Sequence, residues 1–429
     1  MPIAAHVLTA VSFSMETDRS AEFAPGVRVL ADCGDDGERL GTVSACSYDS
    51  GAGLTAVTLA MDAGQTLTDR LSGVRHGIAV PLSLLSPPGC FFRDARFAAR
   101  PVSLAADRCT VLTPSRMAVD VGGALLCLLA QRSIDISQAA AWDGTAAHYA
   151  AAANRAGRDF YIYACNDAGS LRLLCSADAV CPAGYTVAAS RKVGGFHCLC
   201  ASVGTIGGHA LSGYLAGDIL PDSVWDLKFC PVCAPEGMVY VPALAKWVDI
   251  YLASVADGRL VSASGGTIAD GASSPAFHWY KFSQWLGAAG KRLPTQPEFV
   301  AASLGASQGV NIAGSADPGT TGGHVDTAGR RMLSNAGCED CCGVMWQWGA
   351  EAGGSASAAS YANAYDGNDS GVAGQHYQAP NRASWGGAWA GGAACGSRSS
   401  TWANGPLKLA EYFGARGVAD ARAVLEDAP

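Results

Sequence analysis

Short runs in which hydrophobic and polar positions alternate follow one another through the first part of the chain. The clearest run spans residues 54–59 and comes shortly after the turn sequence DSG, and similar runs begin near Val27 and Gly41. Alternation with a period of two, bounded by turn residues, is typical of strands joined by hairpins. We therefore expect a small antiparallel β module over residues 1–88, ended by the chain-breaking sequence SPPG.

Further short apolar runs, separated by glycine, asparagine and aspartate, predict strands at 110–112, 117–121, 124–129 and 160–164. The alanine-rich segment 139–155 has a composition that suits one helix. These features predict a β-sandwich-like module over residues 89–190 with an inserted helical or looped segment. Paired glycines and a proline punctuate the next segment, so residues 191–236 are expected to form a connector.

The hydrophobic period changes in the last part of the chain, residues 237–429. Residues 277–288 carry apolar positions at near-helical spacing, and Gly290 follows as a stop. Thr295 and Glu298 have the spacing of a capping box, in which each side chain bonds the backbone N–H of the other residue. We therefore expect two helices, followed by glycine-rich irregular chain and short aromatic strands.

Four short motifs occur in order within this last part, namely KRLPTQPEF at 291–299, GVMWQW at 343–348, GGAW at 386–389 and GARG at 414–417. Together they resemble the C-type-lectin-like fold in its formylglycine-generating-enzyme branch, where the motifs are roughly KRLPTEAEW, GNVWEW, GGSW and GFR. The resemblance implies an α+β fold, with N-terminal β-rich modules followed by a C-terminal C-type-lectin-like domain over residues 237–429. It covers the first half only loosely, where the first module is similar to those of phage tail fibres.

This branch contains both oxidases and the variable proteins of diversity-generating retroelements. The oxidases bind copper through two cysteines a few residues apart after the GGSW motif, whereas this chain has only Cys395 there. A single soft thiolate is a poor copper site. The chain also lacks the common hydrolase and nucleotide-binding motifs, and His324 and His376 stand alone in loops. We therefore expect a binding protein rather than an enzyme, with a formylglycine-generating-like enzyme as the alternative.

The segment between the last two motifs is rich in small, varied residues. In the retroelement-diversified proteins, randomised adenines turn asparagine-type codons into a restricted set that includes Asn, Ser, Ala, Gly, Thr, Pro, Leu and Tyr. The resemblance therefore implies a variable, ligand-binding surface at Ala388, Ala390, Gly391, Ala393, Ala394, Ser399, Thr401, Ala403, Asn404, Pro406 and Leu407. The large contact side chains expected beside them are Trp402, Tyr361, Tyr365 and Tyr377. The alternative is that this glycine- and alanine-rich segment only packs tightly.

A frame for this surface is predicted from glycines, tryptophans and arginines. Glycines permit a close turn of the backbone, tryptophans fill a core beneath the surface, and partly buried arginines bind carboxylates or backbone carbonyls. The residues expected in these roles are Gly386, Gly387, Trp346, Trp348, Trp389, Arg398 and Arg416. A rigid frame of this kind loses little conformational entropy when the surface binds a ligand.

Charge and hydropathy narrow the possible partners. The net charge is -8 and charged residues make up 15% of the chain, whereas phosphate contact needs clustered lysine and arginine. We therefore expect no nucleic-acid partner. The longest apolar run, near residues 122–130, is too short to cross a bilayer, so membrane insertion is not expected. The first twenty residues lack the basic start and cleavage site of a signal peptide and predict a strand instead.

The chain has 16 cysteines. Without a signal peptide, most are expected to be free, buried thiols that act as small hydrophobic groups. The alternative is a zinc site, because CxxC pairs occur at 230–233 and 338–341 and an HCLC cluster occurs at 197–200. The two pairs lie about a hundred residues apart, without the usual short spacing of zinc ligands. We therefore expect no metal site and no other cofactor.

The resemblance thus implies a phage or prophage receptor-binding protein that determines host tropism and displays a diversified surface on a lectin-like scaffold. Its expected partners are a host cell-surface receptor, either a protein or a glycan, and phage tail components. The expected assembly is a homotrimer in the virion tail, put together in the bacterial cytoplasm. A bacterial cell-surface variable binding protein is a further alternative.

Overall fold

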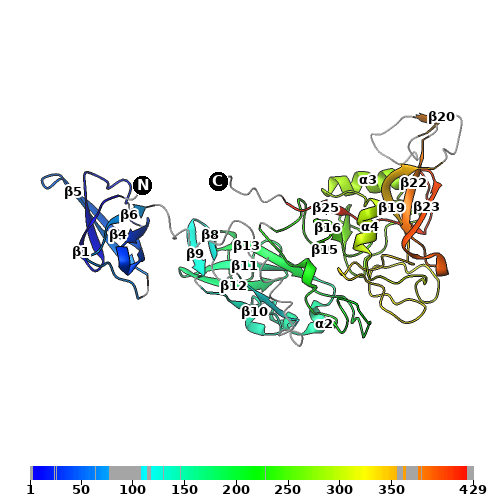
Figure 1. The fold of residues 1–429 in the computed structure, drawn as a ribbon, viewed down its shortest axis with the longest axis horizontal. Coiled ribbons are helices and arrows are strands. Elements are labelled where there is room, and N and C mark those ends of the chain that lie inside the picture. The colour runs from blue at the N-terminus through cyan, green and yellow to red at the C-terminus, as the bar shows by residue number, and fades with distance from the viewer. Residues whose placement is uncertain are drawn as a thin grey trace. The chain divides into compact units, whose positions relative to one another are not determined.

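The computed structural model describes residues 3–76, 108–354, 361–363 and 375–422, apart from short gaps at 24, 26, 63, 114–116, 129, 145, 228 and 378. Strands dominate the fold and helices are few (Figure 1). The chain divides into two compact units. The first comprises Met1–Pro87, Ser115–Gln131 and Ala168–Leu171, and the second comprises Pro88–Pro114, Arg132–Asp167 and Arg172–Pro429. The sequence SPPG, expected to end the first module, lies outside the described residues.

The first unit is built on an antiparallel sheet with the strand order β1-β2-β5-β4-β3-β6. The strands are His6–Thr9 (β1), Ser12–Glu16 (β2), Arg28–Asp32 (β3), Glu38–Asp49 (β4), Leu54–Met61 (β5) and Gly73–His76 (β6). Inward-facing strand positions bury Phe13 of β2 and Val57 of β5 completely, and Phe23 from the turn between β2 and β3 joins the same core. A hairpin of β8 (Met117–Val121) and β9 (Ala124–Leu128) belongs to the same unit. The strands predicted in this part of the chain are confirmed.

A second sheet, of the order β12-β11-β13-β14, corrects the predicted connector. Its strands are Asp159–Asp167 (β11), Ser170–Ser176 (β12), Ser190–His197 (β13) and Trp225–Asp226 (β14), and a separate pair joins Thr110–Leu112 (β7) to Ser133–Asp135 (β10). β13 and β14 fall within the segment expected to be a connector. The reason is close packing, because a Cβ atom at Gly195 would lie 2.5 Å from the Phe160 carbonyl oxygen and 2.7 Å from the Trp225 ring. Gly195 is therefore a close-packing position within the sheet and not part of a linker.

The alanine-rich segment 139–155 does not form one helix. It contains 3₁₀ turns at Ala139–Ala141 and Ala147–Ala150 and the single-turn helix α2, Ala152–Arg155. Trp142 interrupts the segment, because it is buried, bridges to Cys175 and donates its ring N–H to the Ile136 carbonyl at 2.9 Å. Tertiary packing therefore overrides the helix propensity of the alanines.

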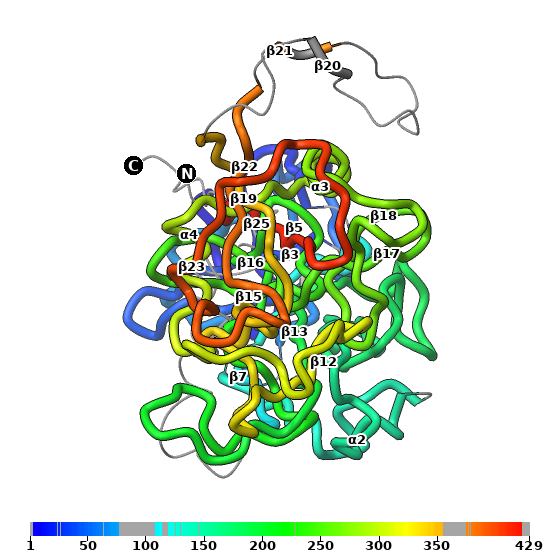
Figure 2. Tube along the Cα trace, turned by 90° about the vertical axis from the view of Figure 1, so that its right-hand side faces the viewer, coloured from blue at the N-terminus to red at the C-terminus, as the bar shows by residue number. Residues whose placement is uncertain are grey.

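The rest of the second unit combines the helices α3 (Trp279–Ala288) and α4 (Gln296–Ala302) with small sheets. One sheet has the order β23-β22-β19-β24, made of Gly396–Asn404, Asn381–Gly386, Trp346–Gly353 and Phe413–Gly414. Another has the order β15-β16-β25, made of Met238–Val241, Lys246–Asp249 and Val418–Asp420. The strand pairs are β17 (Ala253–Ala256) with β18 (Arg259–Ser262), and β20 (Tyr361–Asn363) with β21 (Gln375–Tyr377). Figure 2 shows β23, β22 and β19 side by side.

Both predicted helices are present. His278 precedes α3 and accepts a hydrogen bond from the Lys281 N–H through Nδ1 at 3.2 Å, while Gly290 follows the helix with a φ of 72°. The capping box at the start of α4 is confirmed, and Glu298 accepts from the Thr295 N–H at 2.9 Å. Among the described residues, no helix is long and apolar enough to cross a membrane.

The carboxylate of Glu298 is a pH-dependent support of this region. Burial alone would raise the pKa of its carboxyl, but bonds from Arg292 and Thr295 outweigh burial and lower that pKa from 4.5 to about 2. The Arg292 guanidinium donates to both carboxylate oxygens at 2.6 and 2.5 Å. Because the pKa is lower in the folded state, the carboxylate stabilises the fold above pH 4.5, and this stabilisation is lost as the pH falls towards 2.

We predict that Glu298→Gln lowers the free energy of unfolding by about 1–3 kcal/mol at neutral pH, since it removes a charge-assisted bond pair. The difference from the wild type should shrink as the pH is lowered from 4.5 to about 2. Urea unfolding at a series of pH values measures both effects. Glu411→Gln, at an exposed carboxyl of the same unit, is the control. A stability difference that does not change with pH would contradict a role for the carboxylate.

Candidate ligand-binding surface

Most of the predicted variable residues lie on β23 or on the chain that flanks it. β23 is an edge strand of its sheet as far as the structure describes it, so it presents one side of its backbone without a neighbouring strand. The exposed positions are Ala390, Ala393, Ala394 and Ala403. The partly exposed positions are Ala388, Ser399, Thr401, Trp402, Asn404 and Leu407. The structure therefore gathers small, accessible side chains along one sheet edge and its adjoining turn.

Two predicted variable residues do not suit a changeable surface. Gly391 is exposed, but a Cβ atom there would lie 2.5 Å from the Cys395 Sγ, so any side chain requires that sulfur to move. Pro406 is buried, and its carbonyl accepts a hydrogen bond from the Trp279 N–H at 3.1 Å. Both residues belong to the frame rather than to the surface.

The large side chains expected at the surface have different positions. Tyr377 on β21 is 52% exposed and pairs in register with Tyr361 on β20, whereas Tyr365 lies outside the described residues. Trp402 is only partly exposed, because it packs edge-on against Trp385 with the ring centroids 5.5 Å apart. Trp402 therefore contributes to the frame as well as to the surface.

A tight turn joins β22 to β23 and depends on glycine and on Cys395. Gly386 and Gly387 have φ values of 92° and 86°, which favour glycine. A Cβ atom at Gly386 would lie 2.4 Å from the Cys341 carbonyl oxygen, and one at Gly387 would lie 2.7 Å from the Cys395 Sγ. The Cys395 thiol is buried and donates to the Ala388 carbonyl at 3.4 Å. Its sulfur fills the inside of the turn as a small apolar group.

Two amide side chains that sequence reasoning missed support this turn from a neighbouring loop. Gln308 Oε1 accepts from the Ser397 N–H at 2.9 Å, and Asn311 Nδ2 donates to the Trp389 carbonyl. Trp389 is itself partly buried against a cluster that includes Met332. No local pattern marks Gln308 or Asn311, because their partners lie about eighty to ninety positions away and meet them only in the folded chain.

The tryptophans of β19 form part of the floor. Trp348 is fully buried and stacks on Phe413, with ring centroids 4.4 Å apart and planes 19° from parallel. Trp346 is partly buried in the same cluster, which also contains Phe282 and Leu286 of α3. The sheet is thereby packed against α3 through aromatic and aliphatic contacts.

Arg416 is fully buried and links several segments beneath the surface. Its guanidinium donates to Gln347 Oε1 at 2.6 Å and to the Glu339 carbonyl at 2.6 Å. It also donates to the carbonyls of Asp249 and Ile250 at 2.9 and 3.2 Å. These contacts are of the kind expected for this arginine, since a buried guanidinium needs several acceptors in fixed positions.

Arg398 does not have the position predicted for it. The residue is exposed on β23 and forms no hydrogen bond or ion pair with the part of the chain that the structure describes. Burial alternates along β23, and the register of the strand turns position 398 outward. Arg398 therefore belongs to the surface, and the expectation that it anchors the frame is wrong.

Ion pairs balance the charges buried beneath the surface. Lys291 pairs with Asp249 at 2.6 Å, Arg331 with Glu339 at 2.6 Å and His324 with Asp340 at 3.0 Å. Burial alone would lower the pKa of His324, but the Asp340 carboxylate outweighs burial and raises it. Opposite charges matched in this way avoid the cost of isolated buried ions. The His324 ring is therefore part of a structural ion pair.

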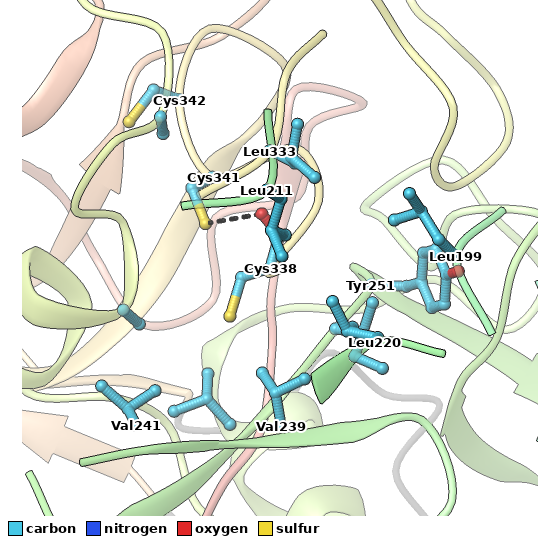
Figure 3. Packing of buried hydrophobic residues seen from close by; sticks show 14 of the residues in the cluster. Leu199, Leu211, Leu220, Val239, Val241, Tyr251, Leu333, Cys338, Cys341 and Cys342 are labelled. Carbon is cyan, nitrogen blue, oxygen red and sulfur yellow. Dashed lines mark hydrogen bonds between the residues drawn. The ribbon is translucent and has the colours of Figure 1, made fainter. Parts of the chain in front are cut away.

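The cysteines serve mainly as packing groups. Cys338, Cys341 and Cys342 lie in a hydrophobic cluster with Val239 and Leu333, and the Cys341 thiol donates to the Cys338 carbonyl at 3.7 Å (Figure 3). The CxxC pair formed by Cys230 and Cys233 lies in a different cluster, together with aromatic residues. Apart from Cys109, every described cysteine is free, and all of the described cysteines are at least partly buried. Within the described ranges, no three metal-ligating side chains come together.

Comparisons with known proteins agree with this architecture. Residues 120–226 match a family model described as the Mtd second domain. The chain is 36% identical over 286 residues, 62% of this chain and 71% of the relative, to the tail fiber receptor-binding protein of Bordetella phage BPP-1. Among solved structures, the Major Tropism Determinant M1 variant is 31% identical with a TM-score of 0.60, covering 73% of this chain and 81% of that one. The P3c variant is 27% identical with a TM-score of 0.63, covering 88% and 94%.

Proposed function

Because the chain belongs to the family of phage tail fibre receptor-binding proteins that includes the Major Tropism Determinant variants, we propose that it binds a receptor on the host bacterium. In this proposal it is a phage or prophage protein that determines host tropism. Its partner is a protein or glycan of the host cell surface.

The contrast between β23 and the frame beneath it carries this proposal. Ala390 and Ala403 are exposed and small, whereas Trp348, Trp385 and Arg416 are fully buried. Exposed side chains away from packed contacts change stability little when they are replaced. A rigid floor under changeable side chains also reduces the conformational entropy that is lost when a ligand binds. The arrangement supports many alternative ligand surfaces on one fold.

In this proposal the ligand-binding positions are the accessible ones among those expected from the sequence. They are Ala388, Ala390, Ala393, Ala394, Ser399, Thr401, Ala403, Asn404 and Leu407, together with the larger side chains of Trp402 and Tyr377. Tyr361, which pairs with Tyr377, is proposed as a further contact. Template-directed diversification of these positions would change the ligand while leaving the floor intact.

We also propose that the β-rich first unit attaches the protein to other tail components and that the chains form a homotrimer. Three sites on one assembly bind a cell surface more tightly than one site, provided that they engage together. The protein is then a virion component of the tail, assembled in the bacterial cytoplasm. A clean monomer mass in light scattering at micromolar concentration would contradict the trimer.

Binding without catalysis is supported by the position of Cys395. Its thiol is buried within the turn, and burial raises the pKa of that thiol. The oxidases that the motifs resemble bind copper through two cysteines a few residues apart, and β23, which follows Cys395, contains no cysteine.

We predict that Ala390→Tyr and Ala403→Tyr change which bacterial strains the protein binds while shifting its free energy of unfolding by less than about 0.5 kcal/mol. Gly391→Tyr should instead lower stability, because its side chain displaces Cys395. Binding of the labelled full-length protein to a panel of strains, together with thermal melting, measures both effects. The assignment of surface and frame fails if Ala403→Tyr melts as early as Gly391→Tyr and the strain preference stays the same.

A further inference from the structure

Arg382 on β22 carries a guanidinium that aromatic rings hold in place. Its Cζ lies 4.4 Å from the centroid of the Trp279 ring and 6.0 Å from that of Tyr280. Trp279 is itself fixed, because its ring N–H donates to the Gly349 carbonyl at 2.7 Å. Stacking on an aromatic face restricts the orientation of the planar guanidinium.

This guanidinium lacks an acidic partner within the described chain. Arg28, Arg292 and Arg331 each bond a carboxylate at 2.6, 2.5 and 2.6 Å. Arg382, in contrast, forms neither an ion pair nor a hydrogen bond with any described residue, and its Nε is buried without a partner. Partly buried donors are costly when they lack acceptors. An external acceptor would complete the site.

Arg382 also lies beside the proposed variable strand. It pairs directly with Asn404 of β23. Residues directly opposite each other in an antiparallel pair place their side chains on the same face, with Cβ atoms about 5 Å apart. Asn404 is partly exposed. A ligand that contacts the changeable Asn404 position therefore also comes within reach of a constant positive charge.

We propose that Arg382 is a fixed contact for a carboxylate on a protein receptor, while the neighbouring positions of β23 vary. The proposal rests on the receptor-binding function proposed above. Arginine binds carboxylates through two parallel N–H···O bonds, which fix the orientation of the partner. Arginine, tryptophan and tyrosine are also the residues enriched at the energetic centres of protein interfaces.

An open sheet edge favours a protein surface over a small sugar, since small ligands are bound mainly in concave sites. The cavity of about 830 Å³ in the second unit is lined by other residues, among them Tyr161, Glu236 and Trp285, and by none from β22 or β23. The ligand class assigned to Arg382 is thus an aspartate or glutamate side chain presented by a protein. Every receptor accepted by this scaffold would share that carboxylate.

The test is a selection from a random peptide display library with the full-length protein as bait. Peptides bound by the wild type are expected to be enriched in aspartate and glutamate. Arg382→Gln should lose this enrichment and should bind a selected acidic peptide about tenfold to a hundredfold more weakly, as expected for a charge-assisted bond. Arg382→Lys, which keeps the charge without the planar fork, should give a smaller loss.

Arg259→Gln is the matched control, because Arg259 is an exposed arginine of β18 in the same unit that lies on neither β22 nor β23, and it should keep the enrichment. Equal acidic enrichment with Arg382→Gln, or none with the wild type, overturns the proposal. If Ala403→Tyr changes the selected peptides but Arg382→Gln does not, the receptor-binding function stands and only the role of Arg382 fails. A different result is that the wild type binds a uronate-bearing oligosaccharide that Arg382→Gln no longer binds, and shows no preference for acidic peptides. That result overturns the assignment to a protein receptor. Thermal melting shows whether Arg382→Gln is folded. If it is not, the peptide binding of Arg382→Lys decides the outcome.

Discussion

The hydrogen bonds of the buried Arg416 guanidinium are the interaction on which the C-terminal part of the structure depends. They join the end of β16, the loop at Glu339 and the strand β19 through Gln347. Burying a guanidinium costs several kcal/mol unless acceptors and opposite charges compensate it. The carbonyls supply the acceptors, and Asp249 and Asp340 add negative charge nearby. The segments that meet at Arg416 are thereby fixed relative to one another.

A short series of contacts connects Arg416 to the surface and fixes the position of the surface. Gln347 donates to the carbonyls of Asp340 and Cys341 at 3.0 and 2.9 Å. The Cys341 carbonyl oxygen lies so close to Gly386 that a Cβ atom there would be only 2.4 Å from it. Gly386 starts the turn that Cys395 fills, and β23 follows. The exposed side chains stand at the end of this series and make few of its contacts, so the proposed function expects them to change without loss of the fold.

Local patterns predicted the features whose causes are local. The capping box of Thr295 and Glu298 needs only a spacing of three residues, and the strands of the first unit need only alternation. Sequence could not distinguish Arg416 from Arg398, because burial depends on segments that meet only in the folded chain. The space around Gly391 is likewise set by the Cys395 sulfur inside the turn, so the residue type alone suggested a changeable position. Family motifs predicted the region of the surface, and tertiary packing decides which of its residues are exposed.

The most direct test of this account compares Arg416→Met with Arg398→Met. Removing the buried guanidinium leaves Gln347 and the carbonyls without their donor, which should lower the free energy of unfolding by about 3–5 kcal/mol. Removing the exposed guanidinium of Arg398 should change it by less than about 0.5 kcal/mol. Urea unfolding followed by tryptophan fluorescence measures both values. Equal stability of the two variants would contradict the claim that the Arg416 hydrogen bonds hold the floor beneath the binding surface.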